Sequence, residues 1–274
     1  MSVVEKYLRV NKMPHIWCPG CGNGIVLGAF IRAIDKLGYS KEETVVVSGI
    51  GCSSRASGYL DFNTLHTTHG RALAFATGIK VTRPELKVFV IMGDGDATAI
   101  GGNHFIHAAR RNIDITAIVF NNSIYGMTGG QYSPLTPPGS KATTAPYGTL
   151  EKPFNIPELA KAAGATYVAR GTSYHAKMLS DLIYKGAQNK GFSMIEAITQ
   201  CPISFGRRNK MGSGADMLKW QKDISVTVKA AGKLPPEKLE GKLIIGELYN
   251  SEAPEFTEQY AELVERISPK RGEG

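Results

Sequence analysis

The sequence predicts a doubly wound α/β fold with a mainly parallel sheet and an extended C-terminal tail. Apolar runs of strand length alternate with helical stretches along most of the chain, which is the pattern of a parallel sheet wound with helices. Several runs are apolar throughout, as in strands that are buried on both faces. Glycine, aspartate and asparagine follow two of these runs directly, at residues 93–96 and 121–122. Open α/β sheets bind ligands at such strand ends.

The first part of the chain supplies an arm, a helix and a strand. Residues 1–17 are expected to form an N-terminal arm. A Cys-Pro-Gly-Cys turn then leads into a helix over residues 25–37, which Gly38 ends. A strand over residues 44–48 runs into a glycine-containing loop, and a helix over residues 72–81 follows.

The centre of the chain reads as a strand–helix–strand unit. Strands are expected over residues 87–92 and 115–120, with a helix over residues 103–111 between them. Asp94 and Asn122 then lie at the carboxyl ends of two strands. Hard oxygen ligands beside glycines suit a hydrated magnesium ion. The alternative is that Asp and Asn only form turns at the strand ends, as they do in many proteins.

The second half repeats the α/β alternation after a loop over residues 125–152 that is dense in Pro, Gly, Ser and Thr. A loop of this length in a compact domain is usually functional or a partner surface. The expected elements are helices over 156–163 and 175–190, strands over 166–169 and 192–199, a short helix over 217–222, a strand over 239–248 and a helix over 256–267. The pattern thins after residue 205. We therefore expect an α/β domain over residues 1–205 and a C-terminal arm over residues 206–274 that packs on a partner subunit.

The charge and the length of the apolar runs exclude several classes of protein. The net charge is +8, but the basic residues are dispersed and are not interleaved with aromatic residues. This disfavours nucleic acid and favours an acidic protein partner. The longest apolar runs are about ten residues, too short to span a membrane, and no apolar signal core is found at the N-terminus. A cytoplasmic protein is the expectation.

Four cysteines form a second candidate site. Cys52 and Cys201 each follow a predicted strand, and Cys18 and Cys21 precede a helix that faces the same edge of the sheet. Four thiolates that converge there suit zinc or an iron–sulfur cluster, and the sequence does not separate the two metals. The alternative is that the cysteines are small buried apolar residues.

Two elements of the sequence together resemble the thiamine diphosphate motif. Gly93-Asp94-Gly95 is followed, after 25 residues, by Asn121-Asn122. In proteins with this motif, the diphosphate is held through a divalent ion. The resemblance implies that Asp94, the Asn122 side chain and the backbone carbonyl of Ile124 ligate magnesium, in a sheet of the thiamine diphosphate-binding type.

The combined pattern resembles the β subunit of the 2-oxoacid:ferredoxin oxidoreductases. The matching motifs are Trp17-Cys18-Pro19-Gly20-Cys21-Gly22, Gly49-Ile50-Gly51-Cys52-Ser53, Thr68-His69-Gly70-Arg71, Gly93-Asp94-Gly95-Asp96, residues 121–131 and Cys201-Pro202. The resemblance implies that Cys18, Cys21, Cys52 and Cys201 bind a 4Fe-4S cluster. It also implies that the thiamine cofactor is lined by Ile50, Gly51, Cys52, Ser53, His69, Gly95, Asp96, Asn122, Gly126 and Met127.

The activity that this resemblance implies is the oxidative decarboxylation of a 2-oxoacid, with electrons passed through the cluster to ferredoxin and the acyl group to coenzyme A. Residues 128–131 and 205–212 look most like the members specific for 2-oxoglutarate, whose products are succinyl-CoA and carbon dioxide. Pyruvate and branched-chain 2-oxoacids remain open. His69 is a candidate hydrogen-bond donor to substrate or cofactor. Arg55 and Arg71 are candidates for the substrate carboxylates; a structural role remains open for all three.

The resemblance also implies that the chain needs a partner. In this family the glutamate that activates the thiamine ring comes from the α subunit, and we find no convincing internal candidate. Two rival functions remain. One is a non-redox thiamine diphosphate decarboxylase or synthase subunit with structural zinc. The other is a non-catalytic scaffold organised by zinc.

Overall fold

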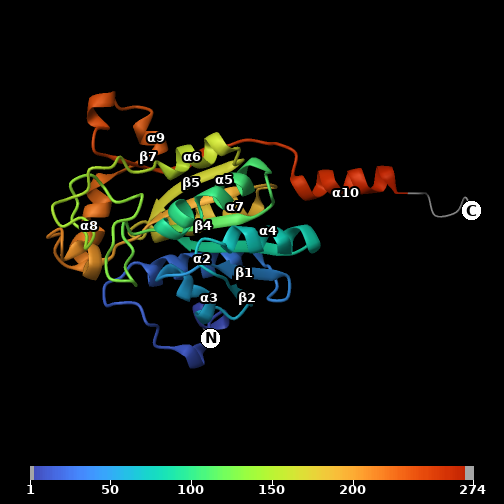
Figure 1. The fold of residues 1–274 in the computed structure, drawn as a ribbon, viewed down its shortest axis with the longest axis horizontal. Coiled ribbons are helices and arrows are strands. Elements are labelled where there is room, and N and C mark those ends of the chain that lie inside the picture. The colour runs from blue at the N-terminus through green and yellow to red at the C-terminus, as the bar shows by residue number, and fades with distance from the viewer. Residues whose placement is uncertain (1–2, 269–274) are drawn as a thin grey trace, which may run out of the picture.

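The computed structural model describes residues 3–268, and an eight-stranded sheet lies at its centre (Figure 1). The strand order is β2-β1-β3-β4-β6-β5-β8-β7. All neighbouring pairs are parallel except β5 and β8. The strands are β1 (Thr44–Ser48), β2 (Asn63–His66), β3 (Lys87–Gly93), β4 (Thr116–Asn121), β5 (Tyr167–Thr172), β6 (Ser193–Ile198), β7 (Ser225–Thr227) and β8 (Leu243–Asn250).

Helices cover both faces of the sheet. Helices α2 and α7 pack on one face, and α4, α5 and α6 pack on the other (Figure 1). The helices are α1 (Val3–Lys6), α2 (Asn23–Leu37), α3 (Ala56–Tyr59), α4 (Ala72–Thr82), α5 (Gly102–Arg110), α6 (Ile156–Ala163), α7 (Ala176–Gln188), α8 (Gly214–Ile224), α9 (Val228–Ala231) and α10 (Phe256–Ile267). The predicted fold class is confirmed.

The central strands are apolar throughout because both of their faces are buried. In β3, Phe89 and Ile91 face α2 and α7, whereas Val88 and Val90 face α4 and α5. Each of these side chains is at most 4% exposed. Burying one such side chain contributes about 1.5–3 kcal/mol, so the sheet that positions the strand ends is also the main source of stability.

The C-terminal segment corrects one prediction. Residues 206–274 were expected to lie outside the sheet as an arm, but β8 pairs with β5 in the antiparallel direction, with Val168 opposite Tyr249. Without β8, β5 would be an open sheet edge with unpaired backbone groups. Helix α10, in contrast, projects away from the body of the molecule (Figure 1). Its docking on a partner subunit stays a prediction.

The order of the strands places a ligand-binding crevice between β1 and β3. The chain leaves β1 toward β2 on one side, and β3 lies on the other side of β1 and leads toward β4. Open α/β sheets bind ligands where strand order reverses in this way. Strand β2 and helix α3 were not predicted. Within residues 3–268, no helix is both long enough and apolar enough to cross a membrane.

Candidate active site at the carboxyl edge of the sheet

A narrow cleft of about 80 Å³ opens at the carboxyl ends of β1, β3 and β4. The loops after these three strands supply its walls, and His69 reaches it from the segment after β2. The structure brings together every residue predicted to line the cofactor. The lining residues are Ile50, Gly51, Cys52, Ser53, His69, Gly93, Asp94, Gly95, Asp96, Asn122, Ile124, Tyr125, Gly126, Met127 and Thr128.

Asp94 presents a buried carboxylate to this cleft. It follows β3 directly and is 2% exposed. The Ser133 hydroxyl donates a hydrogen bond to its Oδ2 atom, from the long loop after β4. Burial raises the pKa of Asp94 to about 7, because an apolar environment disfavours the charged form. A bound cation would reverse this effect by stabilising the carboxylate.

The turn after β4 places the other two predicted magnesium ligands. Asn122 Oδ1 accepts a hydrogen bond from the Ile124 backbone N–H at 3.2 Å. The Ile124 side chain is 2% exposed and packs with Phe205 and Met217, so its backbone has a fixed position. Asp94, Asn122 and Ile124 all line the one cleft, an oxygen-rich donor set of the kind that magnesium prefers.

The buried Asp96 pairs with the partly exposed His69 in the same cleft. The distance between His69 Nδ1 and Asp96 Oδ1 is 2.5 Å, and the Gly70 backbone N–H donates to the same oxygen at 2.6 Å. A proton on Nδ1 would be shared with Asp96, which leaves Nε2 free for a ligand. Asp96 begins a π-helical turn, residues 96–100, a distortion that is frequent at functional sites.

The two predicted arginines lie outside the lining of the cleft. Arg55 is exposed and ends a short helical turn whose other two residues, Ser53 and Ser54, are buried. Arg71 donates to the Ile100 carbonyl at 3.0 Å and so links two loops at the edge of the cleft. The structure thus supports a structural contact for Arg71, and a substrate-binding role for Arg55 stays a prediction.

A second cavity, of about 280 Å³, is lined by all four cysteines. The hydrogen bonds of two neighbouring residues hold their segments together. Trp17 Nε1 donates to the Cys52 carbonyl at 2.6 Å, and the Gly22 N–H donates to the Gln200 carbonyl at 3.1 Å. Cys18, Cys21, Cys52 and Cys201 therefore line one cavity at this edge of the sheet, and their role as metal ligands stays a prediction.

The four thiols line one cavity, but they are not close enough to one another to form a metal site as they stand. Within the described part of the chain, no three His, Cys, Asp or Glu side chains lie close enough together to hold a metal ion as they stand. Burial raises the pKa of Cys21 to about 12 and that of Cys52 to about 11. Four converging sulfur donors fit an iron–sulfur cluster or zinc, since either would stabilise the thiolates.

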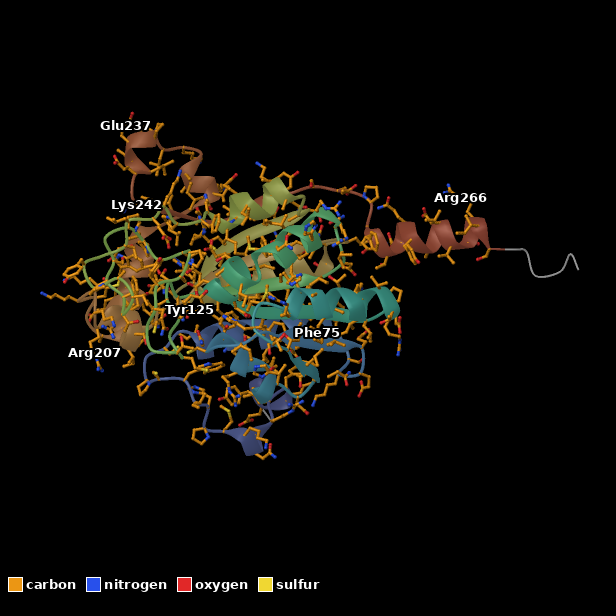
Figure 2. The ribbon with its side chains drawn as sticks, in the orientation of Figure 1. Phe75, Tyr125, Arg207, Glu237, Lys242 and Arg266 are labelled. Carbon is orange, nitrogen blue, oxygen red and sulfur yellow. The ribbon has the colours of Figure 1, made fainter. Side chains whose placement is uncertain are left out.

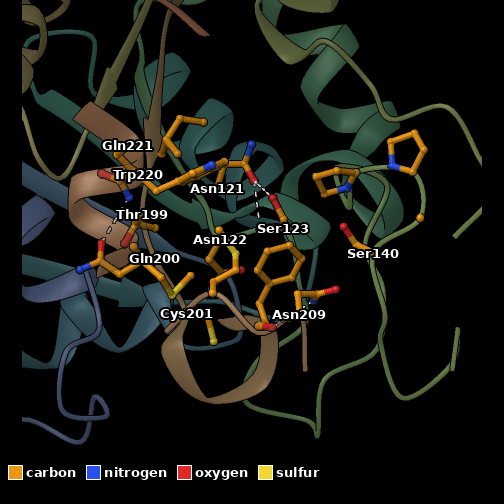
Figure 3. Close-up of a pocket in the computed structure, with 17 residues that line it drawn as sticks. Asn121, Asn122, Ser123, Ser140, Thr199, Gln200, Cys201, Asn209, Trp220 and Gln221 are labelled. Atoms are coloured by element: carbon orange, nitrogen blue, oxygen red, sulfur yellow. Dashed lines mark hydrogen bonds between the residues drawn. The ribbon is translucent and has the colours of Figure 1, made fainter. Parts of the chain in front are cut away.

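The cleft and the thiol cavity share walls. Cys52, Asn122, Gly126 and Met127 line both. A Cβ atom added to Gly126 would lie 3.5 Å from Cys52 Sγ and 3.6 Å from Cys201 Sγ. A third cavity, of about 440 Å³, meets the cleft at Asn122 and the thiol cavity at Cys201 (Figure 3).

Sequence reasoning missed several residues of the cleft. Gly93, Tyr125 and Thr128 lie within or beside the motifs that were recognised, so their positions carried a signal. Ser133, the hydrogen-bond donor to Asp94, carried none, because it comes from an irregular loop whose course depends on long-range contacts.

The fold and the cleft define an α/β domain that binds thiamine pyrophosphate. Residues 20–197 match the model of the thiamine pyrophosphate enzyme C-terminal TPP-binding domain. The 2-oxoglutarate synthase subunit KorB of Methanothermobacter marburgensis is 55% identical over 265 residues, which cover 97% of this chain and 93% of that protein. The 2-oxoglutarate oxidoreductase subunit KorB of Mycobacterium tuberculosis is 42% identical, over 79% of this chain and 59% of that protein.

A solved structure agrees with these relatives. The 2-oxoglutarate:ferredoxin oxidoreductase from Magnetococcus marinus, with 2-oxoglutarate, coenzyme A and succinyl-CoA bound, matches with a TM-score of 0.87 and 37% identity. The match covers 98% of this chain and 92% of that chain. The chain therefore belongs to the thiamine pyrophosphate enzymes, in the family of 2-oxoglutarate:ferredoxin oxidoreductase β subunits.

A glycine that faces Asp96 offers a test of the cleft. A Cβ atom at Gly49 would lie 1.9 Å from Asp96 Oδ2, whereas one at Gly58 would meet nothing within 4 Å. Gly49→Ala should displace the Asp96 carboxylate from His69. Overpacking of this kind costs about 1–3 kcal/mol, so we expect thiamine pyrophosphate affinity to fall about tenfold. Calorimetric titration of each variant with thiamine pyrophosphate, with magnesium present, measures this affinity. Equal affinities for Gly49→Ala and the control Gly58→Ala would contradict the assignment.

Proposed function

We propose that this chain is the thiamine-binding subunit of an enzyme that converts 2-oxoglutarate and coenzyme A to succinyl-CoA and carbon dioxide, and that passes the two electrons through a 4Fe-4S cluster to ferredoxin. One observation carries the proposal. The thiamine cleft and the four-thiol cavity are adjacent and share Cys52, Asn122, Gly126 and Met127 as walls. Substrate-derived electrons therefore have a short path from one site to the other.

Magnesium is the cation that fits the oxygen donors of the cleft. Asp94, the Asn122 side chain and the Ile124 carbonyl would hold it. The space beside Gly95 is taken by the Tyr125 ring, whose hydroxyl donates to the Gly95 carbonyl at 3.2 Å. Thiamine pyrophosphate, when bound, supplies the electron sink that decarboxylation of a 2-oxoacid requires. The buried Asp94 carboxylate would be balanced by the cation rather than by a protein side chain.

His69 is the residue that we assign to the reacting end of the cleft. Asp96 orients its imidazole through the 2.5 Å contact at Nδ1, so that Nε2 is directed away from Asp96 and is available to a substrate or cofactor atom. The ring is 35% exposed, enough to contact a ligand. Arg55 is our candidate for a substrate carboxylate, since a guanidinium offers a planar fork of donors.

The cleft is incomplete without a second chain, which we take to be the α subunit. Its volume of about 80 Å³ is well below the roughly 300–1,000 Å³ of typical small-molecule sites. Among the described residues, no glutamate lines it, so the activating glutamate would come from the partner. Ile50 and Met127 at its rim are 40% and 47% exposed, as expected for a surface that a partner covers.

Helix α10 is the second surface that we assign to the α subunit. Tyr260, Leu263, Val264 and Ile267 recur at helical spacing and are 40–69% exposed, which gives the helix an apolar stripe without a partner inside residues 3–268. Its first turn is fixed to the body, because Glu255 Oε1 accepts the Asp114 N–H at 3.0 Å. We therefore assign to α10 the role of the arm that packs on the partner subunit. Four reduced thiols also suit a cytoplasmic setting.

Activity of the assembled enzyme tests this function. The chain co-purified anaerobically with its α subunit should reduce methyl viologen only with both 2-oxoglutarate and coenzyme A, and should form succinyl-CoA. Asp94→Ala should abolish magnesium-dependent cofactor binding and leave the iron content unchanged. Cys201→Ser should lose iron and retain thiamine pyrophosphate.

Three results would contradict the proposal. A higher kcat/KM with pyruvate or a branched-chain 2-oxoacid would refute the substrate assignment. Zinc in place of iron, with decarboxylation that reduces no acceptor, would favour the non-redox decarboxylase. Cofactor binding by Asp94→Ala as tight as in the parent would favour a non-catalytic scaffold.

The electron acceptor is expected to dock beside the thiol cavity. Arg207, Arg208 and Lys210 follow the π-helical turn after Cys201, are exposed, and pair with no acidic side chain in the described part of the chain. Figure 2 shows Arg207 at the margin of the molecule, apart from Lys242. A Cβ atom at Gly130 would lie 3.5 Å from Arg208 Nε, so this group borders the loop that lines the cavity. An acidic ferredoxin complements these charges.

Removal of these charges should weaken the docking of ferredoxin alone. In the assembled enzyme, Arg207→Ala/Arg208→Ala should raise the KM for ferredoxin about tenfold at low ionic strength and reduce its salt dependence. Methyl viologen reduction should not change, because that small acceptor needs no docking surface. Lys238→Ala/Lys242→Ala is the matched control. Equal KM values in the two double variants would place the docking surface elsewhere.

A further inference from the structure

A buried ion pair lies behind the turn that carries Asn122. Glu196 on β6 is 2% exposed, and its Oε2 atom is 2.6 Å from Nε of Arg170 on β5. The two residues are direct neighbours across the strands. Removing two charges from water is costly, and a buried ion pair is often no better for stability than apolar residues of the same size. Stability alone therefore does not account for the Arg170–Glu196 pair.

The second oxygen of Glu196 is used to hold Asn121. The Asn121 Nδ2 group donates to Glu196 Oε1 at 2.7 Å, and Asn121 itself is 8% exposed. A carboxylate oxygen only accepts hydrogen bonds, so this contact fixes which end of the Asn121 amide faces it. The Oδ1 atom of Asn121 must then point toward the turn after β4.

That oxygen holds the turn in its shape. Asn121 Oδ1 accepts the Ser123 backbone N–H at 3.0 Å and the Ser123 hydroxyl at 3.4 Å (Figure 3). Ser123 has a φ of 59°, in the left-handed region that non-glycine residues enter rarely and only where their surroundings require it. The reversal at Ser123 separates Asn122 from Ile124, the two proposed magnesium ligands of this turn.

Arg170 anchors the arrangement to other parts of the fold. Its Nη2 atom donates to Asn155 Oδ1 at 3.0 Å, at the start of α6, and its Nη1 atom donates to the Ile244 carbonyl of β8 at 3.4 Å. Arg170 thus balances the charge of Glu196 and restricts the position of its carboxylate. The chain of contacts runs from β8 and α6 through β5 and β6 to the end of β4.

We propose that Glu196 is a positioning residue: it orients the Asn121 amide, which holds the Ser123 turn so that Asn122 and Ile124 are preorganised for the divalent ion. The inference rests on the proposed magnesium-held cofactor. Its specific consequence is that, once the Arg170–Glu196 pair is removed, metal affinity depends on whether residue 196 offers a hydrogen-bond acceptor to Asn121. Iron content and the docking of ferredoxin are independent of it.

Two double variants separate the hydrogen bond that Glu196 accepts from Asn121 from the charge of the Arg170–Glu196 pair. Arg170→Met/Glu196→Gln and Arg170→Met/Glu196→Met both lack the ion pair, and they differ in whether residue 196 offers an oxygen to Asn121. The probe is Mn²⁺ binding to the assembled αβ enzyme with thiamine pyrophosphate present, followed by the paramagnetic resonance signal of the free ion. We expect the Kd for Mn²⁺ to rise about tenfold with Met and to stay within about threefold of the parent with Gln.

Equal Kd values in the two double variants would overturn the proposal, whether both match the parent or both are weakened. Thermal unfolding and iron content are measured in parallel, and a purely structural role would lower the unfolding temperature without separating the Gln and Met variants. If the Met variant does not assemble, Asn121→Ala removes the same hydrogen bond from the other side. It should weaken Mn²⁺ binding about tenfold, and parent-like affinity there would overturn the proposal as well. If the parent enzyme binds Mn²⁺ tightly and the two double variants differ as expected, but the parent has no activity with 2-oxoglutarate, the proposed function is refuted and the role of Glu196 is not.

Discussion

Hydrogen bonding between parallel strands is the constraint on which the site depends. The pairing of β1 with β3, and of β3 with β4, fixes in register the points at which the three strands end. Their following loops must therefore emerge side by side at one edge. Since the strands are buried on both faces, a shift of one residue in register would exchange side chains between the two helical layers and disrupt the packing of both. The position of the cleft is thus a consequence of the same packing that stabilises the domain.

The adjacency of two different donor sets follows from this constraint. Oxygen donors come from the loops after β3 and β4, and sulfur donors come from the segments before α2, after β1 and after β6. Cys52 belongs to both cavities because it lies on the loop after β1, which passes between them. A hard cation site and a soft thiolate site select different metals by ligand chemistry. In the proposed function, one edge of the sheet would therefore hold a diphosphate and a redox centre without exchange of their metals.

The sequence predicted most of the central strands and helices, because these are encoded by short patterns. The residues that line the cleft came from motifs that resemble a known family, and their roles stay predictions. Helix α10 was predicted with the bounds that the structure has, and the cleft residues sit on motifs at strand ends. Pairing between distant segments was not predictable in this way. Strand β8 joins β5 across 70 intervening residues. The arm was predicted because the α/β pattern thins after residue 205. Glu196 is a single polar residue in a buried strand, and its sequence position does not indicate a partner. It contacts Asn121 only because β4 and β6 are adjacent in the sheet.

The position of the two metal centres is the most direct test of this account. Crystals of the anaerobic αβ enzyme, with Mn²⁺ in place of Mg²⁺, can be measured at the absorption edges of iron and manganese. We predict an iron peak enclosed by the sulfur atoms of Cys18, Cys21, Cys52 and Cys201, and a manganese peak beside Asp94 at the same edge of the sheet. Zinc among the cysteines, or manganese away from Asp94, would contradict the central claim.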